Sequence, residues 1–285
     1  MSAAAPRPRP SRRSWLENLP KHVVLVGAAV LALAPVVFML MTALKTQDQY
    51  LDDTLGPPWP LSLSNFREAL HGGDFWIWLK NSAIMTFGAV VVSTLAAALC
   101  AFAIARMRFR GQNLLLSANI ALLIVPPVVL LIPLFAQYSD LGLISTYRGV
   151  VIIYAGLTAP FSVYLLTSFF RTIPDELLES AMADGASHFR ILWQIVVPLS
   201  APAFVTLVVV NSLWVWNELL IALVFLPEDR LKTLMVGITV FQGRYSLDVP
   251  VLMAGMLLAS VPMLLLSLIG QRYFIRGLTA GAIKG

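Results

Sequence analysis

The segment Arg171–Pro202 reads RTIPDELLESAMADGASHFRILWQIVVPLSAP, and its pattern decides how the rest of the chain is interpreted. It is too polar to cross a bilayer, and it carries too many helix start and stop signals for a flexible linker. Pro174 suits the first position of a helix, and the acidic residues after it favour the positive N-terminal end of that helix. Gly185 readily adopts the left-handed conformation that ends a helix, and Ser187 can cap a second helix directly afterwards. The segment therefore predicts two short helices joined by a sharp glycine corner.

The second of these helices carries one apolar stripe. Its members recur at positions i, i+3, i+4 and i+7, on a single helix face: Phe189, Leu192, Trp193 and Val196. That face must be buried against lipid headgroups, against other helices of the chain or in a partner protein, and periodicity does not choose among the three. Prolines at 198 and 202 are expected to bend the chain before the next apolar stretch.

The composition around this segment is that of a membrane protein. Hydrophobic residues make up 58% and charged residues 12%, with a mean hydropathy of +0.80, against roughly 45–50% and about 25% in a soluble domain. The single Cys100 excludes an internal disulfide framework, and the three histidines have no metal-ligand spacing. The net charge of +5 comes from basic residues in short loops between apolar runs, a pattern typical of membrane topology rather than of nucleic-acid binding.

Six stretches are long and apolar enough to cross a bilayer core, which needs roughly 20 helical residues: Val23–Leu44, Ala83–Ala105, Leu114–Gln137, Gly149–Phe170, Ala203–Leu226 and Pro250–Gln271. They divide the chain into a disordered basic cytoplasmic tail (1–22), a first span (23–44), an external loop with an interfacial helix (45–82), a core of five spans (83–271) that includes the 171–202 loop, and a cytoplasmic tail (272–285). Prolines are expected to kink the third span, at 126, 127 and 133, and the sixth, at 262.

Orientation follows from the basic residues. If the N-terminus is cytoplasmic, most of the 20 Lys and Arg residues fall in cytoplasmic segments, as the positive-inside rule requires. Both termini and the 171–202 loop are then predicted to lie in the cytoplasm.

The 171–202 loop also carries a longer motif. Glu179-Ser180-Ala181, then Gly185 and, after nine intervening residues, Ile195-x-Val197-Pro198 closely resemble the signature loop of permease subunits in binding-protein-dependent ABC importers, written E-A-A-x3-G-x9-I-x-L-P. Ser180 and Val197 depart from that pattern by mild changes in size.

Further matches point to the carbohydrate branch of that family: Asn65-Phe66, Asn81-Ser82, Ala101–Arg106, Phe169-Phe170-Arg171, Trp216-Asn217-Glu218, Gln271-Arg272-Tyr273-Phe274 and the tail from Gly277 to Gly285. The chain resembles the smaller, six-span permease of maltose-type and glycerol-phosphate-type importers. The resemblance implies an all-α membrane protein with the type I ABC importer permease fold, in which the 171–202 loop is a cytoplasmic coupling-helix loop.

The resemblance also implies partners and a location. A second permease subunit would complete the translocation path for a sugar or sugar-like solute, two cytoplasmic ATPases would bind ATP and Mg, and an extracytoplasmic binding protein would deliver the solute. The complex would lie in the cytoplasmic (inner) membrane of a bacterium or archaeon. This chain has no Gly-x4-Gly-Lys-Ser/Thr phosphate loop, so it is expected to bind no cofactor and to have no catalytic residue.

In such permeases the coupling helix sits in a cleft of the ATPase. The positions that match it here are Glu179, Ala181, Asp184, Gly185, Ala186, Ser187, His188, Phe189 and Pro198. Glu179 and Asp184 would either hold the loop together or meet the ATPase, and Phe189 would either enter the cleft or pack within the loop. The C-terminal tail, with Gly281 and Lys284, would reach the ATPase interface or fray.

Polar residues in the fifth span are candidates for the solute path. Asn211, Trp214 and Asn217 would line it, with a sugar ring stacked on the tryptophan; alternatively, Asn217 and Glu218 form a polar clamp between helices. Glu218 cannot face lipid without a cost of roughly 2.5–3.5 kcal/mol, so it must face the interior or a wet cavity.

The external loop Pro227–Val249 resembles the segment that probes the open cleft of the binding protein, which would assign contacts to Leu234, Val236 and Gly237. Its alternative role is a lid over the helix bundle. The main rival for the whole chain is an ion-gradient-driven secondary transporter of a small polar solute, which would be expected to show inverted repeats and several intramembrane carboxylates.

Overall fold

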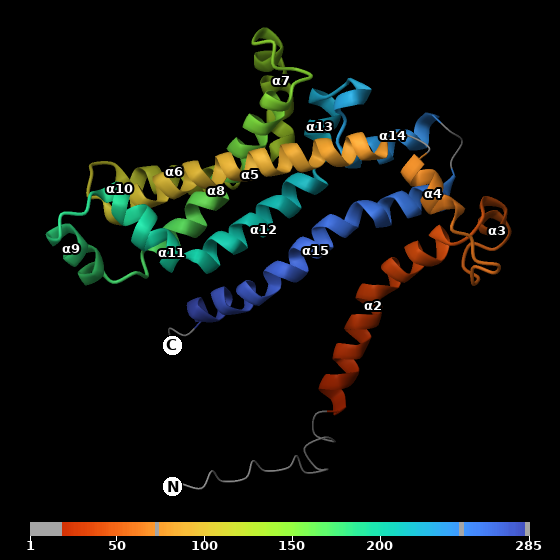
Figure 1. The fold of residues 1–285 in the computed structure, drawn as a ribbon, viewed down its shortest axis with the longest axis horizontal. Helices are drawn as coiled ribbons and strands as arrows, with labels where there is room; N and C mark the ends of the chain where they lie inside the picture. Colours follow the sequence, from red (N-terminus) through yellow and green to blue (C-terminus); the bar gives the residue numbers. More distant parts are fainter. Residues whose placement is uncertain (1–18, 72–73, 245–247, 283–285) are drawn as a thin grey trace, which may run out of the picture. The chain divides into compact units, whose positions relative to one another are not determined.

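A computed structural model describes residues 19–71, 74–244 and 248–282, and every regular element in those ranges is a helix (Figure 1). This confirms the predicted all-α class. The helices separate into two compact units. The smaller unit holds the described residues up to 69 together with 248–257, and the larger unit holds the described residues of 70–244 together with 258–282.

Four helices are long and apolar enough to span a membrane: Pro20–Ala43, Phe75–Arg106, Tyr147–Phe170 and Val249–Gln271. Two bent helix pairs bring the number to six if each is one span: Gln112–Leu122 with Pro127–Asp140, and His188–Leu199 with Ala201–Asn217. The number agrees with the six predicted spans, but several boundaries and two of the shapes differ.

The first boundary correction concerns α2 (Leu19–Ala43), which begins before the predicted residue 23 and takes in the end of the predicted tail. The rest of that tail lies outside the described residues. Helix α5 (Phe75–Arg106) likewise begins ahead of the predicted residue 83, so the piece expected to be an interfacial helix opens a membrane span. Phe75 and Trp78 are buried. An interfacial helix and the end of a span have the same periodicity, so tertiary packing decided between them.

The predicted third span is broken rather than kinked. Helix α6 (Gln112–Leu122) is followed by a 3-10 turn (η1, Pro127–Leu130) and α7 (Leu131–Asp140), and the two arms meet at 94°. Pro126 and Pro127 have no N–H to continue the helical ladder, and a proline disfavours helical geometry in the residue before it. Figure 1 shows α7 pointing away from the direction of α6 as a result.

The predicted fifth span is also interrupted. Helix α12 (Ala201–Asn217) ends at Glu218, whose backbone is extended, and α13 (Leu220–Phe225) resumes after it. At its other end, α12 makes an angle of 79° with the preceding helical run. By contrast, the sixth span, α15 (Val249–Ala282), remains one helix through Pro262 and continues into the predicted C-terminal tail.

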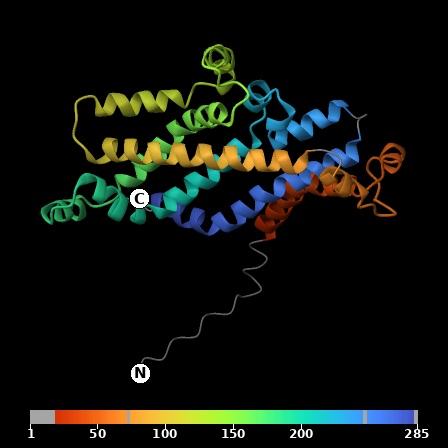
Figure 2. The same ribbon diagram turned by 45° about the horizontal axis from the view of Figure 1, so that its top comes forward.

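In the larger unit, α5 packs along α8 (Tyr147–Phe170) and also against α12 (Figure 2). Small residues at 89, 97, 98 and 101 on α5 are fully buried and let the backbones approach closely, as is typical of helix pairs in membranes. One apolar cluster surrounds the ends of α5 and α8 that lie near the 171–202 loop, and a second surrounds α7, α13 and the other end of α8.

The smaller unit contains α2, α3 (Gln47–Asp52), most of α4 (Ser64–His71) and the first turns of α15. Its loops are fixed by two buried side chains. The Lys45 ammonium donates to the carbonyls of Asp53 (2.6 Å) and Thr54 (3.0 Å), and the Asn65 amide donates to those of Ala43 (2.8 Å) and Lys45 (2.6 Å). The stretch after α2 is therefore an ordered structure.

Candidate coupling and solute sites

The glycine corner forms as the sequence predicts. Helix α9 (Asp175–Ala183) ends in a Schellman motif, in which the Gly185 N–H donates to the Met182 carbonyl and the Ala186 N–H donates to the Ala181 carbonyl, each at 3.0 Å. Gly185 has a φ of +81°, a region that side-chain-bearing residues rarely adopt. Ala181 and Ala186 pack together against the apolar cluster. The motif fixes the four-residue spacing between the alanine and the glycine of the signature.

The second helix of the loop begins at its predicted cap. The Ser187 hydroxyl accepts a hydrogen bond from the Arg190 N–H (3.3 Å) at the start of α10 (His188–Ile191). A π-helical turn (η2, Leu192–Val196) and α11 (Val197–Leu199) follow without a break. The ring of a proline within a helix clashes with the carbonyl four residues earlier, and the wider π-turn lies directly before Pro198, where it relieves that crowding.

The apolar stripe of the second helix is divided between two environments. Leu192 and Val196 are buried in the cluster formed with α5 and α8, which is one of the three alternatives for this face. Phe189 remains 67% exposed, with its ring centroid 6.0 Å from that of Trp193. The inner part of the stripe anchors the loop to the bundle, and Phe189 projects from it.

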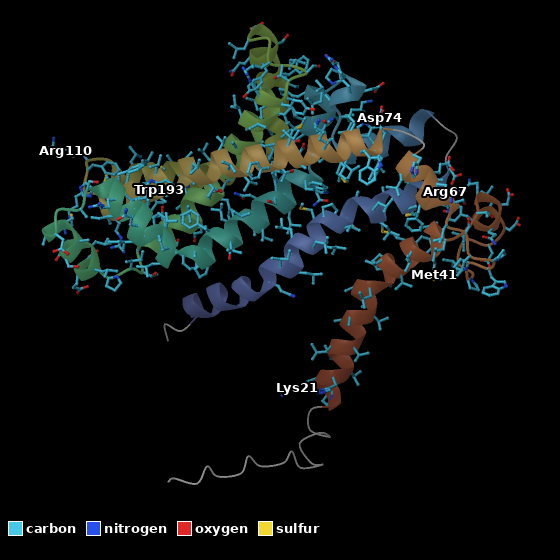
Figure 3. The ribbon with its side chains drawn as sticks, in the orientation of Figure 1. Lys21, Met41, Arg67, Asp74, Arg110 and Trp193 are labelled. Carbon is cyan, nitrogen blue, oxygen red and sulfur yellow. The ribbon has the colours of Figure 1, made fainter. Side chains whose placement is uncertain are left out.

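The acidic side chains of the loop are exposed. In the part of the chain that the structure describes, the carboxylates of Glu179 and Asp184 have no hydrogen bond or ion pair, so they do not hold this loop together. His188 is exposed as well, and its ring lies 6.4 Å from that of Phe102. Figure 3 shows the labelled Trp193 and Arg110 at the same end of the larger unit, which carries both the loop and the turn between α5 and α6.

The predicted path residues differ in their burial and in their hydrogen-bond partners. Asn211 is 2% exposed, and its amide donates to the Ser162 hydroxyl (2.8 Å), which lies 3.3 Å from that of Ser93. The chain of three polar side chains joins α12, α8 and α5. Asn211 therefore lies in a helix interface, which corrects its predicted position on the path. The Asn217 amide donates to the Leu213 carbonyl (2.7 Å) of its own helix.

Glu218 is used inside the chain. Its carboxylate accepts hydrogen bonds from the Tyr154 hydroxyl (2.8 Å) and from the N–H groups of Ile221 (3.0 Å) and Ala222 (3.2 Å). These bonds cap α13 at the break in the span and tie it to α8. The arrangement is a polar clamp between helices, but its partner is Tyr154, which was not among the predicted site residues, rather than Asn217.

Trp214 is the predicted path residue that faces an open space. It lines a cavity of about 640 Å³ together with residues of the broken α6–η1–α7 span and of α8. It is 39% exposed, and its ring meets that of Tyr154 edge-on at 6.1 Å. Tyr138 of α7 also lines the cavity, and most of the remaining wall is apolar.

The external residues predicted to contact a binding protein are buried. Leu234 and Val236 have no exposed surface, and a Cβ at Gly237 would lie 2.1 Å from the Trp78 ring. The Leu234 N–H donates to the Ser82 hydroxyl (2.8 Å), and the Asn81 amide donates to the carbonyls of Arg230 (3.0 Å) and Lys232 (2.8 Å). This corrects the prediction: the three residues fasten the start of α14 (Leu234–Arg244) to α5, in the alternative role of a lid.

Two further predictions concern the C-terminal tail and metal binding. Gly281 lies in the last turn of α15, and Lys284 lies outside the described residues, so the predicted C-terminal contact with an ATPase stays a prediction. Among the described residues, no group of three His, Cys, Asp or Glu side chains is placed to hold a metal ion.

Comparison with known proteins gives a consistent result. Residues 89–279 match the family model described as binding-protein-dependent transport system inner membrane component. A Caldicellulosiruptor protein described as an ABC transporter permease is 39% identical, over 92% of this chain and 96% of the relative. A trehalose/maltose transport system permease protein of Thermococcus litoralis is 32% identical, over 94% and 99%. In fold, the chain resembles a subunit of a bacterial ABC transporter for alginate import, with a TM-score of 0.79, 24% identity and coverage of 94% and 100%.

Proposed function

Because this chain belongs to the inner membrane components of binding-protein-dependent transport systems, we propose that it forms, with a second permease, the path of an ATP-driven importer for a carbohydrate. The chain is a multi-pass inner membrane protein with the type I importer permease fold, and it is a transport subunit of an ABC importer. We also propose the class of the solute, the other subunits and the orientation of the chain.

The position of Trp214 at a cavity supports the proposal that the solute is a carbohydrate. An indole ring that borders a cavity offers a flat apolar surface to the C–H face of a sugar ring, and Tyr138 lies in the same wall. The trehalose/maltose permease among the relatives favours the same class of solute. The largely apolar wall leaves most hydrogen bonds to sugar hydroxyls to the second permease.

The exposed surface of the coupling loop supports the ATPase partners. Phe189, Glu179 and Asp184 are exposed around the Schellman corner, and among the described residues the two carboxylates have no hydrogen bond or ion pair, as a surface that docks elsewhere would. We place two cytoplasmic ATPases there, which would bind ATP and Mg. The corner and α10 continue through the π-turn towards α12, so closure of the ATPases would move the loop and the spans as linked bodies.

Orientation in the membrane follows from the bias of Lys and Arg. The proposal puts the coupling loop and both termini in the cytoplasm of a bacterial or archaeal cell, and the α13–α14 segment on the outer side. Because Leu234, Val236 and Gly237 are buried, a binding protein would meet other residues of that outer face.

The experiment that tests the function separates ATP from ion gradients as the energy source. The complex is purified from its native membrane through a tag on this chain, reconstituted with its binding protein in vesicles, and given a panel of labelled mono- and disaccharides. We expect uptake of one carbohydrate class with enclosed ATP and Mg, unchanged by a protonophore or sodium ionophore. Uptake driven by an ion gradient without ATP would establish the rival secondary transporter. Coupled uptake of only non-carbohydrate solutes would overturn the solute class alone.

A further inference from the structure

One cation at the cytoplasmic end of the bundle connects three helix ends. Arg106 is the last residue of α5, and its side chain is 8% exposed. One guanidinium nitrogen, Nη1, donates to the Asp175 carboxylate at the start of α9. The other, Nη2, donates to the carbonyl of Phe170, the last residue of α8, and to that of Ile173. A single side chain therefore bridges α5, the end of α8 and the beginning of the coupling loop.

The position suits a guanidinium for two physical reasons. The last carbonyls of a helix have no partner within it and carry the negative end of the helix dipole, so a cation there is stabilising. The planar fork of arginine also presents several N–H groups in fixed directions, whereas a lysine ammonium is a compact point charge. Arg106 thus satisfies the carbonyl at the end of α8 and a carbonyl within the Arg171–Pro174 turn at the same time.

The backbone contacts matter more than the ion pair. The Asp175 side chain is 76% exposed, and an ion pair with an exposed partner contributes little because water screens it. The two carbonyls lie at the start of the turn and within it, and the other hydrogen bonds there are short-range: the Thr172 hydroxyl donates to the Phe169 carbonyl, and the Ile173 N–H donates to the Phe170 carbonyl at 3.2 Å. In the part of the chain that the structure describes, Arg106 supplies the hydrogen bonds from α5 to this turn.

We propose that Arg106 is a positioning residue for energy coupling, which fixes the turn between α8 and the coupling loop so that α5, α8 and α9 move as one body. This inference rests on the proposed function. A force on the loop would reach α5 through Arg106, and without Arg106 the turn would flex and absorb part of the displacement. ATP hydrolysis would continue while less solute is moved for each ATP.

The test compares four single substitutions in the reconstituted complex. Arg106→Gln removes the cation and most of the fork, and Arg106→Lys keeps the charge alone. Asp175→Asn removes only the ion pair. The matched control is Arg108→Gln, which removes the same charge from an exposed arginine two residues away. For each variant we would measure the amount of assembled complex, the rate of ATP hydrolysis and the solute transported per ATP.

We expect Arg106→Gln to assemble and hydrolyse ATP at near wild-type rates while transport per ATP falls about fivefold or more, the lower range of energetic coupling between sites. Arg106→Lys should lie between it and the wild type, and Asp175→Asn and Arg108→Gln should remain close to the wild type. An unchanged ratio in Arg106→Gln would overturn the inference. So would a proportional loss of hydrolysis and transport in complex that assembles normally, since that is the signature of a purely structural role.

A distance measurement keeps the inference testable if Arg106→Gln assembles poorly. In a Cys100→Ala background, spin labels at Leu99 on α5 and Glu176 on α9 report on the bridged junction, and labels at Leu99 and Ser168 report on the α5–α8 pair alone. We expect Arg106→Lys to broaden the first distance distribution and not the second. Equal distributions in wild type and variant would contradict the proposal. If wild-type complex moved solute without ATP, the proposed function would fail instead, whatever this distance shows.

Discussion

At the scale of the residue, the side chains in the membrane differ in whether their polar groups are already used. Asn211 and Glu218 have hydrogen-bond partners within the chain, at Ser162 and at Tyr154. Trp214 keeps an open face on a cavity. A buried polar group without a partner is costly, so the chain satisfies these groups internally, and the residue left for a solute is an aromatic one.

Replacement of Trp214 should impair transport and leave assembly intact. Trp214→Ala removes the flat apolar surface, and loss of a stacking contact worth about 1–1.5 kcal/mol lowers transport by up to roughly tenfold. Trp214→Phe should retain most of the rate. The measurement is uptake at saturating solute-loaded binding protein. Trp76→Ala is the control, because Trp76 is 60% exposed and does not line the cavity; similar losses in both variants would argue against the solute assignment.

Gly237 should tolerate no side chain. A Cβ there would lie 2.1 Å from the Trp78 ring, and both Gly237 and Trp78 are buried. Gly237→Ala should therefore destabilise the larger unit by about 1–3 kcal/mol through overpacking. The readout is the midpoint of thermal unfolding of the purified complex. Gly156→Ala is the comparison, because that helical glycine has no atom within 4 Å of the added carbon and alanine favours a helix. Equal midpoints would show that α14 does not pack on Trp78.

At the scale of the element, the coupling loop is a rigid corner, as its helix start and stop signals predict. The Schellman motif, the Ser187 cap and the buried residues Leu192 and Val196 fix its two helices relative to each other and to the bundle. A partner that pushes on Phe189 therefore displaces the whole loop rather than bending it.

Gly185→Ala tests this rigidity. Alanine in the left-handed region costs about 1–2 kcal/mol, so the corner should relax and solute transported per ATP should fall. Gly111→Ala is a close control, because Gly111 has a φ of +89° and, like Gly185, has open space around it, but it lies in the α5–α6 turn. Transport per ATP is measured in both. The rigid-corner model requires the loss in Gly185→Ala to exceed that in Gly111→Ala.

At the scale of the whole molecule, the helices expose apolar surfaces of the kind that lipid and partner chains cover. On α2, large side chains between Val23 and Leu33 are exposed to 59–77%, and none of its apolar window is buried within the chain. A chain of this kind is stable only where a bilayer and other subunits cover it.

Topology can be read by labelling single cysteines in a Cys100→Ala background. Leu55→Cys lies in the exposed segment between α3 and α4, and Arg110→Cys lies between α5 and α6, where Figure 3 labels the arginine. We expect a membrane-impermeant maleimide to label Leu55→Cys in intact spheroplasts and Arg110→Cys only after permeabilisation. Labelling of Arg110→Cys in intact cells would reverse the proposed orientation.

The sequence alone determined the features that depend on a few neighbouring residues. The glycine at 185, the Ser187 cap, the proline breaks and the lengths of the apolar runs act through local backbone energetics, so the coupling corner and the number of spans were predictable. The signature loop added the family. Boundaries shifted where local signals were silent, as at Phe75, whose burial rather than its periodicity makes it part of α5.

The tertiary structure decided which side chains are free to act. The segment with Leu234 and Gly237 resembles one that contacts a binding protein, but residues some 150 positions earlier bury it, as the hydrogen bonds at Asn81 and Ser82 show. Arg106 and Tyr154 gained roles from partners more than 60 residues away. Burial and hydrogen-bond satisfaction are properties of segments brought together in space, and a local pattern holds no information about which distant segment will arrive.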